Sequence, residues 1–190
     1  MVTSSTESQG AEALAALNAR LAYTFTAPGL LAQACTHKSY ANEHRAEGVR
    51  DNERLEFLGD AVLAMTVASR LWRAFPDASE GELTERRADM VCEATLAEIA
   101  RELDLGPALR LGRGETKQGG AEKSRLLASA LEALFGAVYL DGGYAAADAL
   151  VGRLLEPRFG IEPPGYRNSK SRLQEWLQGR GRALPEYRVT

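Results

Sequence analysis

Apolar residues recur with helical spacing along almost the whole chain, and no stretch alternates convincingly between apolar and polar positions as a strand does. The pattern therefore predicts an all-α domain over residues 11–162. Within this domain we expect helices at 12–23, 29–36, 52–74, 79–105, 124–140 and 144–155.

Local signals mark where several of these helices begin and end. Ser79 and Glu82 have the spacing of a capping box, which predicts a helix start at Ser79. Pro76 ends the preceding helix, and Asp141-Gly142-Gly143 separates the last two. The glycine-rich, polar residues 107–120 predict a loop.

The C-terminal residues have a different character. Pro163-Pro164-Gly165 predicts a linker over 163–168. A helix is expected at 169–178, followed by the start of a strand at 184–190. Because so few residues cannot bury a core alone, we interpret 169–190 as the beginning of an incomplete domain.

Composition places the chain among globular cytoplasmic proteins. Of 190 residues, 45% are hydrophobic, enough for one core and an appendage. The polar start lacks the pattern of a signal peptide, and no apolar run approaches the roughly 20 residues that span a bilayer. Cys35 and Cys92 have no metal-ligand or redox spacing, which favours buried thiols in a reducing compartment.

Charge is unevenly distributed along the chain. Residues 167–190 contain six arginines or lysines and two glutamates, a net charge of +4, so the preceding residues carry −7 of the total of −3. An acidic body with a basic tail suits a metal-using domain followed by a phosphate-binding segment. It also suits an ordinary charged surface.

The helix predicted at 52–74 carries an acidic face. Glu53, Glu56 and Asp60 fall within a sector roughly 60° wide. Like charges at these spacings oppose helix formation by a few tenths of a kcal/mol per pair, so the face favours a compensating cation. Phe57 lies beside this sector, and Gly59 inside a helix indicates a close backbone contact.

A second helix carries a matching polar sector. Arg125, Ser129, Glu132 and Gly136 lie within roughly 80° of one another. If the helices cross at their glycines, Glu56, Asp60 and Glu132 converge. Converging carboxylates have raised pKa values unless a divalent cation neutralises them, and all-oxygen ligation favours Mg²⁺ or Mn²⁺ over zinc.

Other candidate residues leave alternatives open. Glu80, in a first helical turn, either supports the metal site or interacts favourably with the helix dipole. His37 fits a structural role at a helix end. No Glu-x-x-His pair, Gly-x-Ser-x-Gly elbow or P-loop occurs, which disfavours di-iron bundles, serine hydrolases and P-loop NTPases.

Residues 52–60, Asn-Glu-Arg-Leu-Glu-Phe-Leu-Gly-Asp, resemble the signature of the ribonuclease III family without a substitution. Further similarity covers most of the chain, in Thr36-His37-Lys38-Ser39, Arg86-Arg87-Ala88 and residues 132–141. The resemblance implies a homodimeric helical endonuclease domain. It also implies Mg²⁺-dependent hydrolysis of double-stranded RNA to 5′-phosphate and 3′-hydroxyl ends, in the processing of rRNA and mRNA precursors.

The resemblance also implies roles for particular residues. Glu56 and Glu132 would bind the metal, Asp60 and Glu132 would form the catalytic pair, and Glu53 and Glu80 would complete the acidic cluster. Phe57 would enter a pocket of a second subunit, although a lone aromatic residue is also typical of a core. Ser171, Gln174 and Glu175 resemble the RNA-facing positions in the first helix of a double-stranded RNA-binding domain.

Ser129 departs from the family pattern, which has an aspartate metal ligand at this position. A serine hydroxyl can coordinate Mg²⁺ but brings no charge. The chain is therefore either an endonuclease with altered metal binding or a dimeric protein that binds double-stranded RNA without cutting it. A metal-carboxylate bundle unrelated to RNA is a third, weaker alternative.

Overall fold

The computed structural model describes residues 3–159, 177 and 179–181. The chain divides into two compact units, Met1–Phe159 and Gly160–Thr190. The linker, helix and strand predicted beyond residue 162 lie outside the described residues, except for the few positions near 177–181, and so do Ser171, Gln174 and Glu175.

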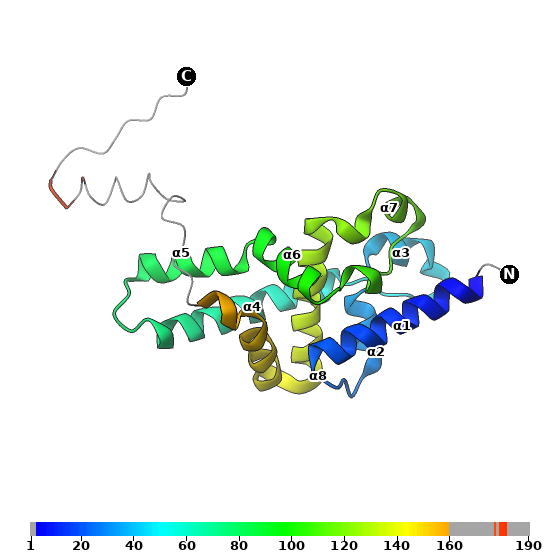
Figure 1. Ribbon diagram of the computed structural model, residues 1–190, viewed down its shortest axis with the longest axis horizontal. Helices are drawn as coiled ribbons and strands as arrows, with labels where there is room; N and C mark the ends of the chain where they lie inside the picture. The colour runs from blue at the N-terminus through cyan, green and yellow to red at the C-terminus, as the bar shows by residue number, and fades with distance from the viewer. Residues whose placement is uncertain (1–2, 160–176, 178, 182–190) are drawn as a thin grey trace, which may run out of the picture. The chain divides into compact units, whose positions relative to one another are not determined.

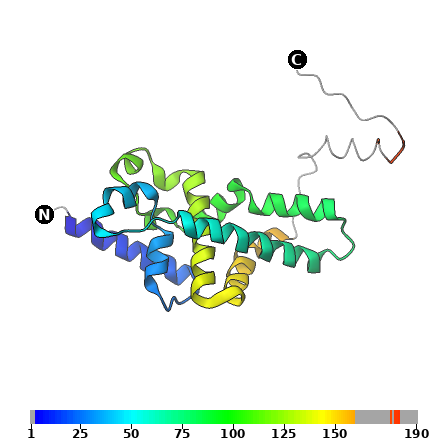
Figure 2. The same cartoon turned by 180° about the vertical axis from the view of Figure 1, so that it is seen from behind.

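Every element of regular secondary structure in the described residues of the first unit is a helix, which confirms the predicted all-α class. Its described residues also contain an isolated parallel β-bridge between Thr36 and Arg110. The elements, shown in Figures 1 and 2, are α1 (Thr3–Leu21), α2 (Pro28–Ala34), α3 (Lys38–Glu43), η1 (Arg45–Glu47), α4 (Glu53–Ala74), α5 (Glu80–Val91), α6 (Glu93–Glu102), η2 (Gly106–Ala108), α7 (Arg113–Lys117), η3 (Gly120–Glu122) and α8 (Ser124–Phe159).

α8 forms the centre of the core. Nearly every residue from Leu127 to Val138 is buried, and α4, α6 and α2 pack around it. The helix breaks at Gly143 (φ 75°, ψ −175°), as the Asp141-Gly142-Gly143 sequence predicts. By length and composition alone α8 could cross a membrane, but 56% of its most apolar stretch is buried inside the protein. Its apolar character therefore belongs to the core.

Asp141 attaches the connection between α1 and α2 to α8. Its carboxylate accepts hydrogen bonds from the Tyr23 hydroxyl (2.8 Å), the Thr26 backbone N–H (2.9 Å) and hydroxyl (2.8 Å), and the Ala27 N–H (2.8 Å). Burial opposes the charged form, but these hydrogen bonds outweigh it and lower the pKa of Asp141 to about 2.

The single helix predicted at 79–105 is wrong, although its capping box is confirmed. The chain is extended at Cys92 (φ −72°, ψ 155°), which separates α5 from α6. The Thr95 hydroxyl (2.7 Å) and the Cys92 thiol (3.3 Å) both donate to the carbonyl oxygen of Asp89. Side-chain donors thus replace the helical partner that this carbonyl loses at the break.

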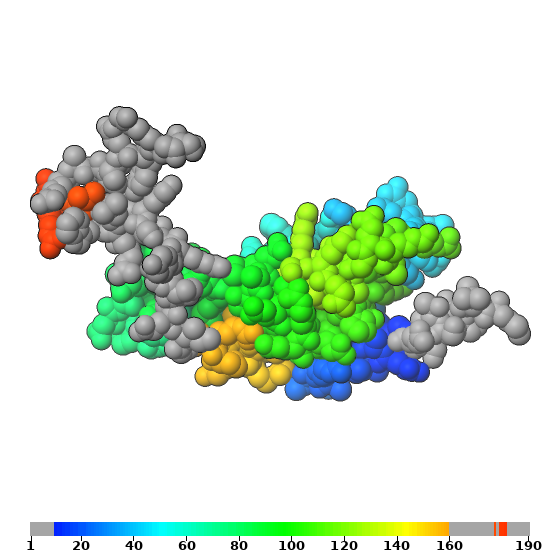
Figure 3. All heavy atoms as spheres, turned by 45° about the horizontal axis from the view of Figure 1, so that its top comes forward, coloured from blue at the N-terminus to red at the C-terminus, as the bar shows by residue number. Residues whose placement is uncertain are grey.

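The loop predicted at 107–120 is also more ordered than expected. It contains parts of η2 and η3 and the whole of α7. Arg110 fastens it to the α2–α3 connection, because its N–H donates to Cys35 (2.8 Å) and its carbonyl accepts from His37 (3.1 Å). Figure 3 shows this yellow-green segment next to the light-blue residues that include α3.

Candidate active site

α4 and α8 cross at two glycines. A Cβ atom added to Gly59 would lie 1.7 Å from the carbonyl oxygen of Glu132, and one added to Gly136 would lie 2.3 Å from the carbonyl oxygen of Leu55. Any larger residue would collide with the opposite backbone. The predicted crossing is confirmed, and it brings the first turns of α4 beside the polar face of α8.

Glu56, Asp60 and Glu132 meet at this crossing. Burial, followed by the charges of Asp60 and Glu56, raises the pKa of Glu132 to about 7. Within the described part of the chain, no lysine, arginine or histidine lies within ion-pair distance of these carboxylates. The site therefore concentrates negative charge that its own side chains do not neutralise.

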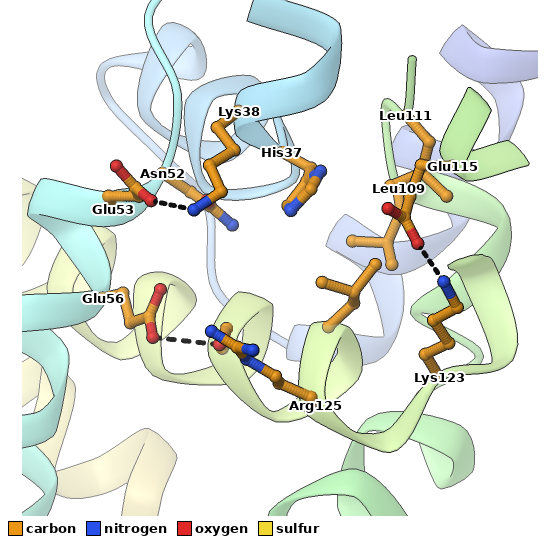
Figure 4. Close-up of a pocket in the computed structure, with 12 residues that line it drawn as sticks. His37, Lys38, Asn52, Glu53, Glu56, Leu109, Leu111, Glu115, Lys123 and Arg125 are labelled. Atoms are coloured by element: carbon orange, nitrogen blue, oxygen red, sulfur yellow. Dashed lines mark hydrogen bonds and ion pairs between the residues drawn. The ribbon is translucent and has the colours of Figure 1, made fainter. Parts of the chain in front are cut away.

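Ser129 lies next to Glu56 at the same crossing. Its hydroxyl donates a 2.9 Å hydrogen bond to Oε1 of Glu56, the dashed line beside Arg125 in Figure 4. Among the described residues, no three carboxylates, histidines or cysteines are already arranged to enclose a metal ion. The acids are near enough to affect one another's protonation, but they do not form a closed ligand cage. Their chemistry, hard oxygen donors with uncompensated charge, still fits Mg²⁺ or Mn²⁺.

The other two predicted acids have different surroundings. Glu53, in the first turn of α4, pairs with Lys38 at 2.9 Å. Glu80 accepts a hydrogen bond from the Thr84 hydroxyl (3.0 Å) in the first turn of α5. The α4–α5 turn is at the outer end of this helix pair in Figures 1 and 2, and 18 residues of α4, about 27 Å, separate it from Glu56. A single chain therefore does not bring Glu80 to the site, and its role there stays a prediction.

A cavity of about 330 Å³ adjoins Glu56 and Ser129 (Figure 4). It is lined by His37, Lys38, Asn52, Glu53, Glu56, Leu109, Leu111, Glu115, Lys123, Arg125, Leu126 and Ser129. His37 caps α3, as its expected structural role requires, and also lines this cavity. The sequence contained no signal for Glu115 or Lys123, because α7 and η3 were not predicted.

Comparison with known proteins identifies the family to which this architecture belongs. Residues 27–158 match the family described as Ribonuclease-III-like. The chain belongs to the ribonuclease III family. A protein named Ribonuclease 3 from Thiobacillus denitrificans is 51% identical over 177 residues, which cover 92% of this chain and 75% of the relative. Ribonuclease 3 from Dechloromonas aromatica is 46% identical over 90% of this chain and 74% of its own length.

A solved structure supports the same assignment. The nuclease domain of ribonuclease III from Campylobacter jejuni is 40% identical and superimposes with a TM-score of 0.71, covering 77% of this chain and 98% of that domain. The ribonuclease III assignment makes this chain an endoribonuclease that acts on RNA.

Proposed function

We propose that this ribonuclease III-type enzyme cleaves double-stranded RNA with the help of Mg²⁺, for which Mn²⁺ can substitute, leaving 5′-phosphate and 3′-hydroxyl ends. The convergence of Glu56, Asp60 and Glu132 at the glycine crossing carries this proposal. Processing of rRNA and mRNA precursors in the cytoplasm is the physiological role that the family resemblance implies.

Each acid has a distinct part in the proposed chemistry. Glu56 and Glu132 would hold the cation, which would polarise the phosphodiester, lower the pKa of a bound water molecule and stabilise the leaving oxygen. Asp60 is exposed on the same face of α4 and orients the groups around the reacting phosphate. Glu53 is neutralised by Lys38, so its part is to position the start of α4.

We further propose that the enzyme is a homodimer. Phe57, Met65 and Trp72 are 82%, 52% and 72% exposed, and their spacing puts them on one side of α4. The Campylobacter jejuni relative has a region involved in dimer formation. A two-fold dimer would present two sites to the two strands of a duplex. In such a dimer, Glu80 of one subunit could reach the site of the other subunit, although it is far from the site of its own chain.

Ser129 favours a second candidate function, namely binding of double-stranded RNA with weak or no cleavage. The hydroxyl supplies a hydrogen bond to Glu56 where the family pattern supplies a negative charge. A metal ion held by fewer carboxylates is bound more weakly. The two candidates therefore differ in the Mg²⁺ concentration at which cleavage begins.

A Mg²⁺ titration separates the two candidates. Labelled duplex RNA, and one of its strands alone as a control, are incubated with the native chain and with Ser129→Asp and Glu132→Gln. Cleavage of the duplex by the native chain at millimolar Mg²⁺, lost in Glu132→Gln, supports the enzyme. Cleavage by Ser129→Asp alone supports the binding protein, and duplex-independent cleavage by all three contradicts both.

A further inference from the structure

The cavity beside Glu56 is lined by three basic side chains that differ in whether a carboxylate pairs with them. Lys38 is paired with Glu53, and Lys123 with Glu115. Arg125 lines the same cavity, yet no carboxylate or other hydrogen-bond acceptor of the described residues is within reach of its guanidinium. Arg125 therefore holds a positive charge next to the catalytic acids without being neutralised by them.

The position of Arg125 relates it directly to the acidic site. It lies four residues before Ser129 and seven before Glu132, and so occupies the same face of α8. Four residues of helix, a rise of about 6 Å, separate it from Ser129. This separation is of the order of the spacing between neighbouring phosphates on one nucleic-acid strand, so both residues could contact the same strand.

His37 provides a second donor to the cavity. Its Nδ1 accepts a hydrogen bond from the Ser39 N–H (3.3 Å) and contacts the Ser39 hydroxyl at 2.8 Å, which assigns the ring proton to Nε2. Burial lowers the pKa of His37, so the ring is neutral at pH 7. The ring lines the cavity and faces its interior in Figure 4, where Nε2–H is available to an oxygen of a ligand.

We infer that Arg125 binds the RNA-backbone phosphate next to the one cleaved at Glu56 and Glu132, with Nε2–H of His37 as a second donor. This inference rests on the proposed function, because it takes the acids as the place of cleavage. A guanidinium forms paired hydrogen bonds with phosphate. Glu53 and Glu115 would otherwise repel the RNA backbone, but each forms an ion pair with a lysine.

Salt-dependent binding tests the contact independently of cleavage. The full chain is titrated into fluorescent duplex RNA without divalent cations, over a series of salt concentrations. For Arg125→Gln we expect roughly three- to tenfold weaker binding near 0.1 M salt, and a slope of log K against log salt that is smaller by about 1. Arg125→Lys keeps the charge and should retain the native slope with slightly weaker binding.

Arg101→Gln is the matched control. Arg101 contacts Ser124 at the start of α8 (2.7 Å) but does not line the cavity, so its loss should leave the slope unchanged. In cleavage assays Arg125→Gln should raise KM and change kcat by less than about threefold, because binding energy common to ground and transition states is lost. A native slope in Arg125→Gln, or an equal change in Arg101→Gln, overturns the inference. Failure of the native chain to cleave, with the Arg125 effect intact, overturns only the proposed function.

Discussion

Glu132 and Asp141 lie nine residues apart on α8 and hold their protons very differently. Glu132 is half-buried beside two other acids, which favours its neutral form. Asp141 accepts hydrogen bonds from two hydroxyls and two backbone N–H groups around it, which favours its charged form. The direction of each pKa change follows from whether the surroundings supply negative charge or hydrogen-bond donors, and each makes stability depend on pH.

Replacement of Glu132 by glutamine should stabilise the metal-free protein at pH 8. The folded-state pKa of Glu132, about 7, lies above the ordinary value of 4.5. The contribution of its neutral form to the stability of the native chain is therefore fully present below pH 4.5 and is lost as the pH rises through 7. The difference corresponds to roughly 3 kcal/mol, which solvent screening at a half-buried site reduces to about 1–2 kcal/mol. Urea unfolding with a chelator at pH 5 and pH 8 measures it. The control Glu122→Gln, at an exposed position, should lose as much stability between pH 5 and pH 8 as the native chain does. If Glu132→Gln also loses that much, the prediction is wrong.

Replacement of Asp141 by asparagine should destabilise the protein at neutral pH but not in acid. The folded-state pKa of about 2 lies below the ordinary 3.8, so the stabilisation is present above pH 3.8 and is lost as the pH falls through 2. Thermal unfolding at pH 6 and pH 2 should show a lower Tm for Asp141→Asn only at pH 6. Asp77→Asn, at an exposed position, serves as the control. Equal Tm differences at both pH values would show that the charge of Asp141 is not responsible.

At the scale of elements, the site depends on how closely α4 and α8 approach. Gly59→Ala would put a methyl group 1.7 Å from the Glu132 carbonyl oxygen, where only displacement of one helix could relieve the collision. We expect a loss of about 3 kcal/mol or more in the free energy of unfolding. Displacement of α8 would also separate Glu132 from Glu56, so cleavage should fall as well.

Gly81→Ala is the comparison for this prediction. Gly81 is exposed in α5, and the nearest atom to an added Cβ is the Ser79 hydroxyl at 4.0 Å. Alanine should leave stability unchanged or raise it by up to about 1 kcal/mol. Urea unfolding of both variants against the native chain decides the matter. Native stability of Gly59→Ala would mean that the helices are not held in contact at this point.

The sequence predicts these elements where local chemistry and tertiary packing agree. The range of α4, its acidic face and the glycine crossing were predictable, because an interior glycine has few reasons other than a close contact. The break at Cys92 was not, because the apolar periodicity continues across it while hydrogen bonds from Thr95 and Cys92 end the helix. α7 is too short to show a helical repeat, so the cavity that it helps to form could not be anticipated.

At the scale of the whole molecule, one chain does not bring together all the acids that the family resemblance implies. It unites Glu56, Asp60 and Glu132 but leaves Glu80 beyond the outer end of α4, which lies about 27 Å along the helix from Glu56. It also leaves large apolar side chains of α4 exposed to solvent. A second copy packed on this face would cover the apolar side chains, and this links the oligomeric state to the activity.

Phe57→Ser should therefore separate the proposed dimer. Burial of a phenylalanine side chain contributes about 1.5–3 kcal/mol, and a two-fold interface contains two copies, so the dimer Kd should rise roughly 100- to 10,000-fold. Sedimentation velocity over a range of protein concentrations should then show monomers. Thermal unfolding should show that the core of each monomer keeps its Tm.

Arg73→Ser is the control for Phe57→Ser, because Arg73 is exposed on a different side of α4 and should leave the dimer intact. Cleavage of duplex RNA by Phe57→Ser should fall in proportion to the loss of dimer and recover at high protein concentration by mass action. A fully active monomer would show that the acids of one chain are enough for cleavage. The exposed Phe57 would then not be needed to form an active dimer. A dimer that persists in Phe57→Ser would place the interface elsewhere on the molecule, and Glu80 would then have no route to the site through this face.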